Sequence, residues 1–126
     1  MSSQSKGIKV YLDDLRDAPD NWIRTYWPEE AIELLKTGNV TEISLDHDLG
    51  NDPRNGYDVI LWIEEAVAIS DFLPPIIHVH SANLSAKVKM MAGIEKIYEM
   101  SLSKLAQKKA ELSQILNQIP IHNKKI

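Results

Sequence analysis

The sequence contains no cysteine among its 126 residues. This absence excludes disulfides, thiolate nucleophiles and zinc sites built on cysteine, and it fits a reducing compartment. The sequence also has no apolar segment of the kind that forms a signal peptide, and no apolar run long enough to span a bilayer. We therefore expect a cytoplasmic protein with no membrane partner.

Positive charge is also scarce. The 14 Lys and Arg residues are outnumbered by 18 Asp and Glu residues, which gives a formal net charge of −4. Sequence-independent binding to nucleic acid depends on clustered lysines and arginines that displace counterions, so we expect no broad nucleic-acid binding. The length and the 44% hydrophobic content suit a single domain with one core.

Strand-like and helix-like segments alternate along the chain. Alternating or β-branched residues predict strands at GIKVYL, VTEISL and IIHVH, and the β-rich stretch WIRTYW is a further short candidate. Helices are predicted after Pro28, over YDVILWIEEAVAI, and from Ser85 almost to Pro120, with a break expected at residues 101–103 because serines often cap helices. This alternation predicts a mostly parallel sheet with right-handed crossovers.

Polar side chains follow three of the expected strands. They are Asp13 and Asp14, then Asp46, His47 and Asp48, and finally His80, Ser81 and Asn83. Because the carboxyl ends of parallel strands share one edge of a sheet, we expect these residues to form a common site. Neighbouring carboxylates repel one another, so such a cluster normally needs a cation or a shared proton.

Each polar cluster also has a structural explanation. The Asp-rich loop after the first strand could be a solvated turn, and Ser81 and Asn83 could cap the following helix. His78 should face the same side of the sheet as His80. Since His78 lies deeper in the strand, we expect it to be a hydrogen-bonded structural histidine, which leaves His80 as the functional candidate.

Three motifs occur in a fixed order: VYLDDLRDAP near the start, LDHDLG followed by GYDV, and a late HSAN. In these motifs the chain resembles the cyclic-phosphate processing receiver domain, a divergent receiver-like family of bacteria and phages, over residues 7–91. Receivers carry an acidic pair after strand one, an aspartate at the end of strand three and a Ser-Ala after strand four. Asp13 and Asp14, Asp46, and Ser81 with Ala82 match these positions.

The resemblance implies a receiver-like (flavodoxin-like), doubly wound parallel α/β sheet with strand order 2-1-3-4 and a degenerate fifth strand. The expected layout is a flexible lead-in at 1–6, the receiver-like domain at 7–99, and a C-terminal helical extension and tail at 100–126. Two features depart from ordinary receivers. No lysine follows an evident fifth strand, and the first crossover helix is reduced to the loop DLRDAPDN.

The family name implies hydrolysis or recognition of cyclic phosphates on nucleotides or RNA ends. The expected metal ligands are Asp13, Asp14, Asp46 and Asp48. Such carboxylates suit Mg²⁺ or Mn²⁺, and an added imidazole would also accept Zn²⁺. The expected acid–base residues are His47 and His80, because imidazole titrates near neutral pH. The expected phosphate-binding residues are Arg16, Ser81 and Asn83.

A non-catalytic alternative remains open at this point. Without the receiver lysine, the chain could instead be a signalling, nucleotide-binding or partner-docking module. A seven-residue ladder in the C-terminal helix offers a further role for the chain; its members are Met91, Tyr98, Leu105, Leu112 and Ile119. The companion heptad positions are mixed, so packing of this ladder onto the domain is favoured over a dimer seam, and both a monomer and a dimer through the helix stay open.

Overall fold

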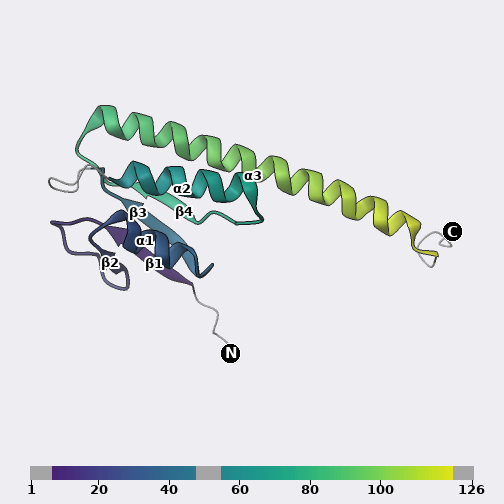
Figure 1. Ribbon diagram of the computed structural model, residues 1–126, viewed down its shortest axis with the longest axis horizontal. Coiled ribbons are helices and arrows are strands. Elements are labelled where there is room, and N and C mark those ends of the chain that lie inside the picture. The colour runs from purple at the N-terminus through teal and green to yellow at the C-terminus, as the bar shows by residue number, and fades with distance from the viewer. Residues whose placement is uncertain (1–6, 48–54, 121–126) are drawn as a thin grey trace.

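The computed structural model describes residues 7–47 and 55–120. It contains one parallel sheet in the order β2-β1-β3-β4. The strands are β1 (Ile8–Leu12), β2 (Ile23–Thr25), β3 (Val40–Leu45) and β4 (Ile76–Val79). The helices are α1 (Pro28–Leu35), α2 (Gly56–Ile69) and α3 (Leu84–Gln118). Figure 1 shows how they alternate with the strands, which confirms the expected strand order and receiver-like architecture.

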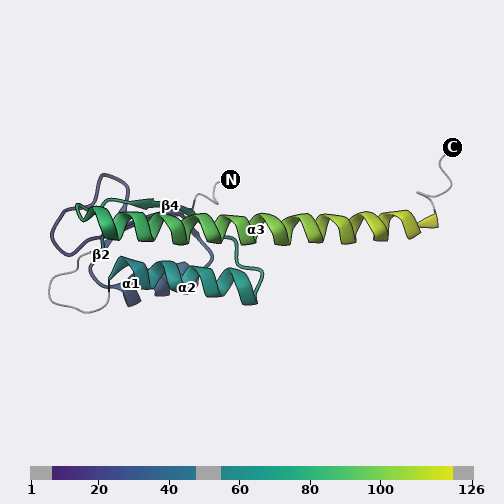
Figure 2. The same ribbon diagram turned by 90° about the horizontal axis from the view of Figure 1, so that it is seen from above.

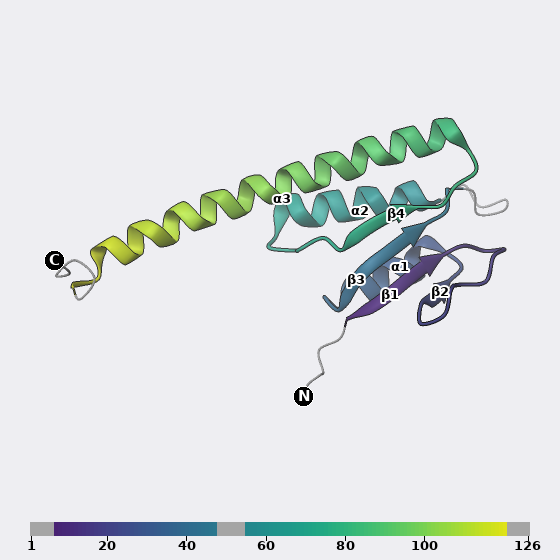
Figure 3. The ribbon, with the colours of Figure 1, turned by 180° about the vertical axis from the view of Figure 1, so that it is seen from behind.

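The core lies between the sheet and a single layer of helices. Alternate residues of the central strands, such as Val10 and Leu12 in β1 and Ile43 and Leu45 in β3, are fully buried. Helices α1 and α2 pack against each other, and α3 packs against α2 and β4. In Figure 3 the strands stand in front and α1 and α2 lie behind them. The helices therefore cover one face of the sheet.

None of the described helices covers the other face, where the β1–β2 connection, residues 13–22, is a loop. This agrees with the expectation that the first crossover helix is reduced. The Trp22 ring lies over this face instead, with its centroid 6.2 Å from those of both Tyr11 and His78, in edge-on geometry. The fifth strand, expected to be degenerate, does not occur in the described part of the chain, where β4 leads directly to α3.

Helix α1 begins and ends as the sequence predicts. Pro28 is its first residue, and the Glu30 carboxylate accepts hydrogen bonds from the backbone N–H groups of Tyr26 (2.7 Å) and Trp27 (3.0 Å). Gly38 follows the helix with φ of 78°, a left-handed conformation that glycine adopts without a steric cost.

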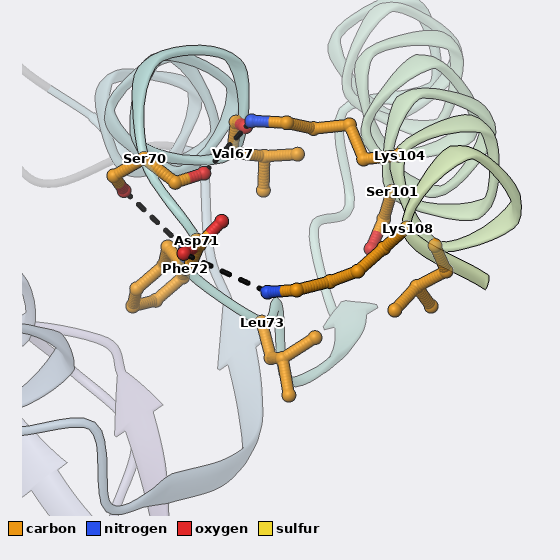
Figure 4. A pocket seen from close by; sticks show the side chains of 9 residues that line it. Val67, Ser70, Asp71, Phe72, Leu73, Ser101, Lys104 and Lys108 are labelled. Carbon is orange, nitrogen blue, oxygen red and sulfur yellow. Dashed lines mark hydrogen bonds and ion pairs between the residues drawn. The ribbon is translucent and has the colours of Figure 1, made fainter. Parts of the chain in front are cut away.

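Helix α3 is one continuous helix of 35 residues, so the expected break at residues 101–103 is wrong. Ser101 is buried, and the Lys104 amine donates to the carbonyl oxygens of Val67 (2.6 Å) and Ser70 (2.8 Å) at the end of α2. Figure 4 shows this lysine spanning the two helices. These tertiary contacts outweigh the weak preference of serine for helix ends.

The seven-residue ladder packs onto the domain only in part. Tyr98 is partly buried, but Leu105, Leu112 and Ile119 are 40–55% exposed. Every described residue after Ser101 is exposed, and Figures 1 and 2 show this half of α3 projecting away from the sheet. The expectation that the whole ladder packs onto the domain is therefore wrong. No described helix is both long and apolar enough to cross a membrane.

Replacing Tyr98 with Phe should destabilise the domain by about 1–3 kcal/mol, because it leaves two buried backbone groups without a partner. The Tyr98 hydroxyl donates to the Pro75 carbonyl and accepts from the Ile77 N–H, both at 2.8 Å. Urea unfolding of the variant measures the loss. Tyr26→Phe, at a half-exposed ring, is the control and should change stability little. Equal stability of the two variants would contradict this account.

The Tyr98 hydroxyl should also make the free energy of unfolding depend on pH. Burial raises the pKa of Tyr98 above its usual value of 10.0, although the Ile77 N–H lowers it. Because the folded state favours the neutral phenol, its contribution is complete below pH 10 and is lost as the pH rises through the folded-state pKa. Wild-type stability should therefore fall more steeply above pH 10 than that of Tyr98→Phe in parallel unfolding curves.

Candidate metal and phosphate site

Asp13, directly after β1, is the most firmly held carboxylate at the carboxyl edge of the sheet. It is 1% exposed, and its Oδ1 accepts from the backbone N–H groups of Leu15 (2.8 Å) and Arg16 (2.9 Å). Its Oδ2 lies 3.1 Å from Nε2 of His80. Burial raises the pKa of Asp13. The two backbone hydrogen bonds and the interaction with His80 together lower it by more, so the pKa lies below its usual value.

His80 is held on three sides. Its Nε2 faces Asp13, its Nδ1 lies 2.7 Å from Oγ of Ser44, and its ring stacks on Tyr11 with centroids 4.2 Å apart. Because an ionised carboxylate can only accept, we assign the proton to Nε2, and Nδ1 then accepts from the Ser44 hydroxyl. Burial lowers the pKa of His80, Asp13 raises it, and the positive charge of Arg16 lowers it, for a net decrease. His80 is thus a neutral group that orients Asp13.

Three carboxylates meet beside this histidine. Asp13, Asp14 and Asp46 each offer an oxygen, and the three oxygens lie within 4.8 Å of one another. Oδ1 of Asp14 is buried and has no hydrogen-bond partner among the described residues. A buried, unpaired carboxylate oxygen is costly, and like charges at this spacing repel. A divalent cation would remove both costs, so these side chains fit a site for Mg²⁺ or Mn²⁺.

The start of α2 fixes the backbone beside this cluster. A Cβ on Gly56 would lie 2.1 Å from the carbonyl oxygen of Asp46, so only glycine permits this close approach. Asn55 caps the helix by accepting from the Tyr57 N–H at 2.8 Å. The third carboxylate therefore stands on a strand end that packs directly against a helix terminus.

The residues expected to bind phosphate lie in two places. Ser81 Oγ accepts from the Asn83 N–H (3.1 Å), and Asn83 Oδ1 accepts from the Ala86 N–H (3.0 Å). These bonds support the capping explanation for both residues. The side chain of Arg16 is exposed and is close enough to His80 to influence its pKa. Phosphate binding by these three residues stays a prediction.

The histidines differ from expectation in one respect. His78 bonds to Glu42 at 3.0 Å, as a structural histidine should, but its side chain is 48% exposed. The expectation that it is more deeply placed than His80 is wrong, because no helix among the described residues covers this face of the sheet, whereas Tyr11 and Asp13 bury His80. His47 is half-buried next to Asp46, and Asp48 lies outside the described residues.

Sequence reasoning missed Ser44 and Tyr11, which hold His80. The parallel register places Tyr11 opposite Ser44 and Ser44 opposite His78, so both side chains share the face of His80. A serine inside an otherwise apolar strand end was the available signal, because a buried hydroxyl needs a partner.

The motifs at this edge agree with a family match. The family model described as "Cyclic-phosphate processing Receiver domain" matches residues 8–96, which include Asp13, Asp14 and Asp46. The chain belongs to the cyclic-phosphate processing receiver domain family. Among curated proteins and among solved structures, no match was found. The matched segment of this receiver domain ends inside α3, before the helix leaves the domain.

Replacing Asp14 with Asn should raise the free energy of unfolding of the metal-free receiver domain by roughly 1 kcal/mol, because it removes one of three clustered negative charges. Thermal unfolding in EDTA measures this change. Asp20→Asn, at an exposed position of the same loop, removes the same charge outside the cluster and should leave stability nearly unchanged. A lower stability of the Asp14 variant would show that the carboxylate is structural.

Proposed function

We propose that this receiver domain binds a divalent cation through Asp13, Asp14 and Asp46 and hydrolyses a cyclic phosphate on a nucleotide or RNA end. The observation that carries the proposal is the buried, unpaired Oδ1 of Asp14 beside two further carboxylates. Mg²⁺ or Mn²⁺ is the preferred ion, and Zn²⁺ is compatible if His47 joins the ligands. The family name supports the phosphate substrate.

The cation would supply charge neutralisation at the phosphate and a water of lowered pKa. The residues of the chain hold the cation and bind the phosphate. Asp13 is kept ionised and oriented by the two loop N–H groups and His80. The exposed guanidinium of Arg16 offers a positive charge to a phosphate oxygen. Ser81 would stand beside the phosphate at the start of α3.

Proton transfer is assigned to His47. Both ring nitrogens of His80 are engaged, by Asp13 and by Ser44, so His80 serves to position a ligand. His47 directly follows Asp46 at the same edge of the sheet. In the proposed reaction the attacking water gives up one proton as its oxygen bonds to phosphorus, the bond from phosphorus to one ring oxygen breaks, and that oxygen takes up one proton, with His47 as the group that transfers it.

One observation favours a non-catalytic alternative. In the described part of the chain β4 is followed directly by α3, so no fifth strand carries the lysine that ordinary receivers have there. A domain with a cation site and no turnover would then recognise a nucleotide or a partner. The two functions share the cation site and differ in whether a product forms.

Thermal unfolding with EDTA, Mg²⁺ or Mn²⁺, repeated with 2′,3′- and 3′,5′-cyclic nucleotides, tests the site. A cation at a hundred times its dissociation constant should stabilise the domain by about 2.7 kcal/mol. Asp14→Asn should abolish this shift and Asp20→Asn should keep it. Linear nucleotide in the same samples supports hydrolysis, and stabilisation by nucleotide without product supports the binding module. Absence of any cation effect contradicts both.

His47→Ala should reduce hydrolysis by about 10²- to 10⁴-fold, the usual contribution of an acid–base group. The cation-induced thermal shift should persist, because the carboxylates remain. His78→Ala, which removes an exposed histidine bonded to Glu42, is the matched control and should keep its activity. Full activity in His47→Ala would refute the assignment of proton transfer to this residue.

A further inference from the structure

The distal part of α3 is tied to the described domain only at its base, where Lys104 donates to carbonyl oxygens at the end of α2 and Lys108 pairs with Asp71. Residues 102–119 are all exposed, and Figures 1 and 2 show the helix extending well past the sheet. Six large apolar side chains in this segment are 40–67% exposed: Leu102, Leu105, Leu112, Ile115, Leu116 and Ile119. A helix of this length gains little stability in water on its own, because most helical stability comes from packing of an apolar face. The exposed apolar side chains of this segment therefore indicate that it packs against a binding partner.

The spacing of these side chains defines the partner as another helix. Five of these six side chains, all except Ile115, fall together with Lys109 at alternating steps of three and four residues: Leu102, Leu105, Lys109, Leu112, Leu116 and Ile119. We call these six residues the distal seam. This spacing is that of the a and d positions of a coiled coil, which form a narrow stripe along one side of a helix. The seam also lies close to the face that buries Ile94, Ile97 and Ser101 nearer the start of α3.

We propose that the distal seam pairs with the same seam of a second copy of this chain in an antiparallel coiled coil. The seam is symmetric about its own centre. Reversal of one helix brings Leu102 against Ile119 of the second copy and Leu105 against its Leu116. The third pair is Lys109 with Leu112 of the second copy. Each of the three pairs joins an a position to a d position, as antiparallel packing requires.

Lys109 selects the antiparallel orientation. In a parallel pair it would face Lys109 of the second copy, and two like charges in the seam would repel. In the antiparallel register it lies against Leu112 of the second copy, where its aliphatic stem packs and its amine reaches solvent. Ala106 and Ser113, on one flank of the seam, are small enough for close approach of the helices.

Charge favours the same arrangement. Residues 102–126 contain five lysines and one glutamate, although the whole chain carries −4, so the rest of the chain is strongly acidic. In a parallel pair Lys104, Lys108 and Lys109 would each lie beside the same lysine of the second copy. In the antiparallel register they lie beside its uncharged Asn117, Ser113 and Leu112 instead, which lowers the repulsion.

The base of the projecting helix offers an apolar surface to the incoming end. A cavity of about 180 Å³ lies between α3 and the end of α2. Figure 4 shows Phe72 and Leu73 below it and the Asp71–Lys108 ion pair, at 3.8 Å, across it. Leu73 is 68% exposed, and Leu105 also lines the cavity. In the proposed register Leu116 and Ile119 of the second copy arrive beside Leu105, at the rim of this cavity.

Sedimentation equilibrium of the full chain tests the dimer. The expected mass is about twice 14.3 kDa, and the double variant Leu112→Asp with Leu116→Asp should be monomeric and still folded, because both side chains are exposed in the single chain. Gln114→Asp with Gln118→Asp adds the same charges on the opposite side of the helix and should remain dimeric. A monomeric wild type at millimolar concentration, or a dimer that survives the Leu substitutions, would overturn the proposal.

Single cysteines test the orientation, since the chain has no cysteine of its own. Leu105→Cys and Leu116→Cys should form a disulfide with each other only after the two variants are mixed and oxidised. In the antiparallel register two copies of the same cysteine are about 16 Å apart along the helix axis, too far for a disulfide. Cross-linked homodimers of each variant alone, or failure of the mixed product to form, would rule out this register.

Discussion

The hydrogen-bonded chain from Asp13 through His80 to Ser44 is the interaction on which the site depends. It joins the ends of β1, β3 and β4, and the Asp13 N–H adds β2 by bonding to the Thr25 carbonyl at 3.0 Å. A buried carboxylate is stable here because every oxygen it presents is paired. Because Asp13 is fixed, the position of the next residue, Asp14, is fixed as well. The buried Oδ1 of Asp14, which has no hydrogen-bond partner among the described residues, therefore faces a defined place beside the other two carboxylates.

The fold is largely predictable because its signals are local. Strand alternation and the proline and glycine that bound α1 follow from the spacing of residue types, and the order of the strands was implied by the resemblance to receivers. The convergence of Asp13, Asp14 and Asp46 was predictable for the same reason, since parallel strands end at one edge. Local patterns also favoured a helix break at 101–103, where contacts from Lys104 to the end of α2 decide otherwise.

The remaining errors concern what covers a surface. His78 and His80 point to the same face of the sheet. His78 is exposed because no described helix covers that face, and His80 is buried because it stacks on Tyr11 and contacts Asp13. The C-terminal ladder has the same spacing whether it packs on its own domain or on another chain. Spacing identifies an apolar face, and the three-dimensional arrangement identifies its neighbour. This receiver domain thus combines three clustered carboxylates at the edge of the sheet with an exposed apolar seam on the projecting half of α3.

The central claim is that the three carboxylates form one cation site. Titration of Mn²⁺ into the metal-free protein, followed by electron paramagnetic resonance of the free ion, tests it most directly. The account predicts one bound Mn²⁺ per chain, competition by Mg²⁺, and loss of binding in Asp14→Asn with retention in Asp20→Asn. No bound Mn²⁺, or binding that is unchanged in Asp14→Asn, would contradict it.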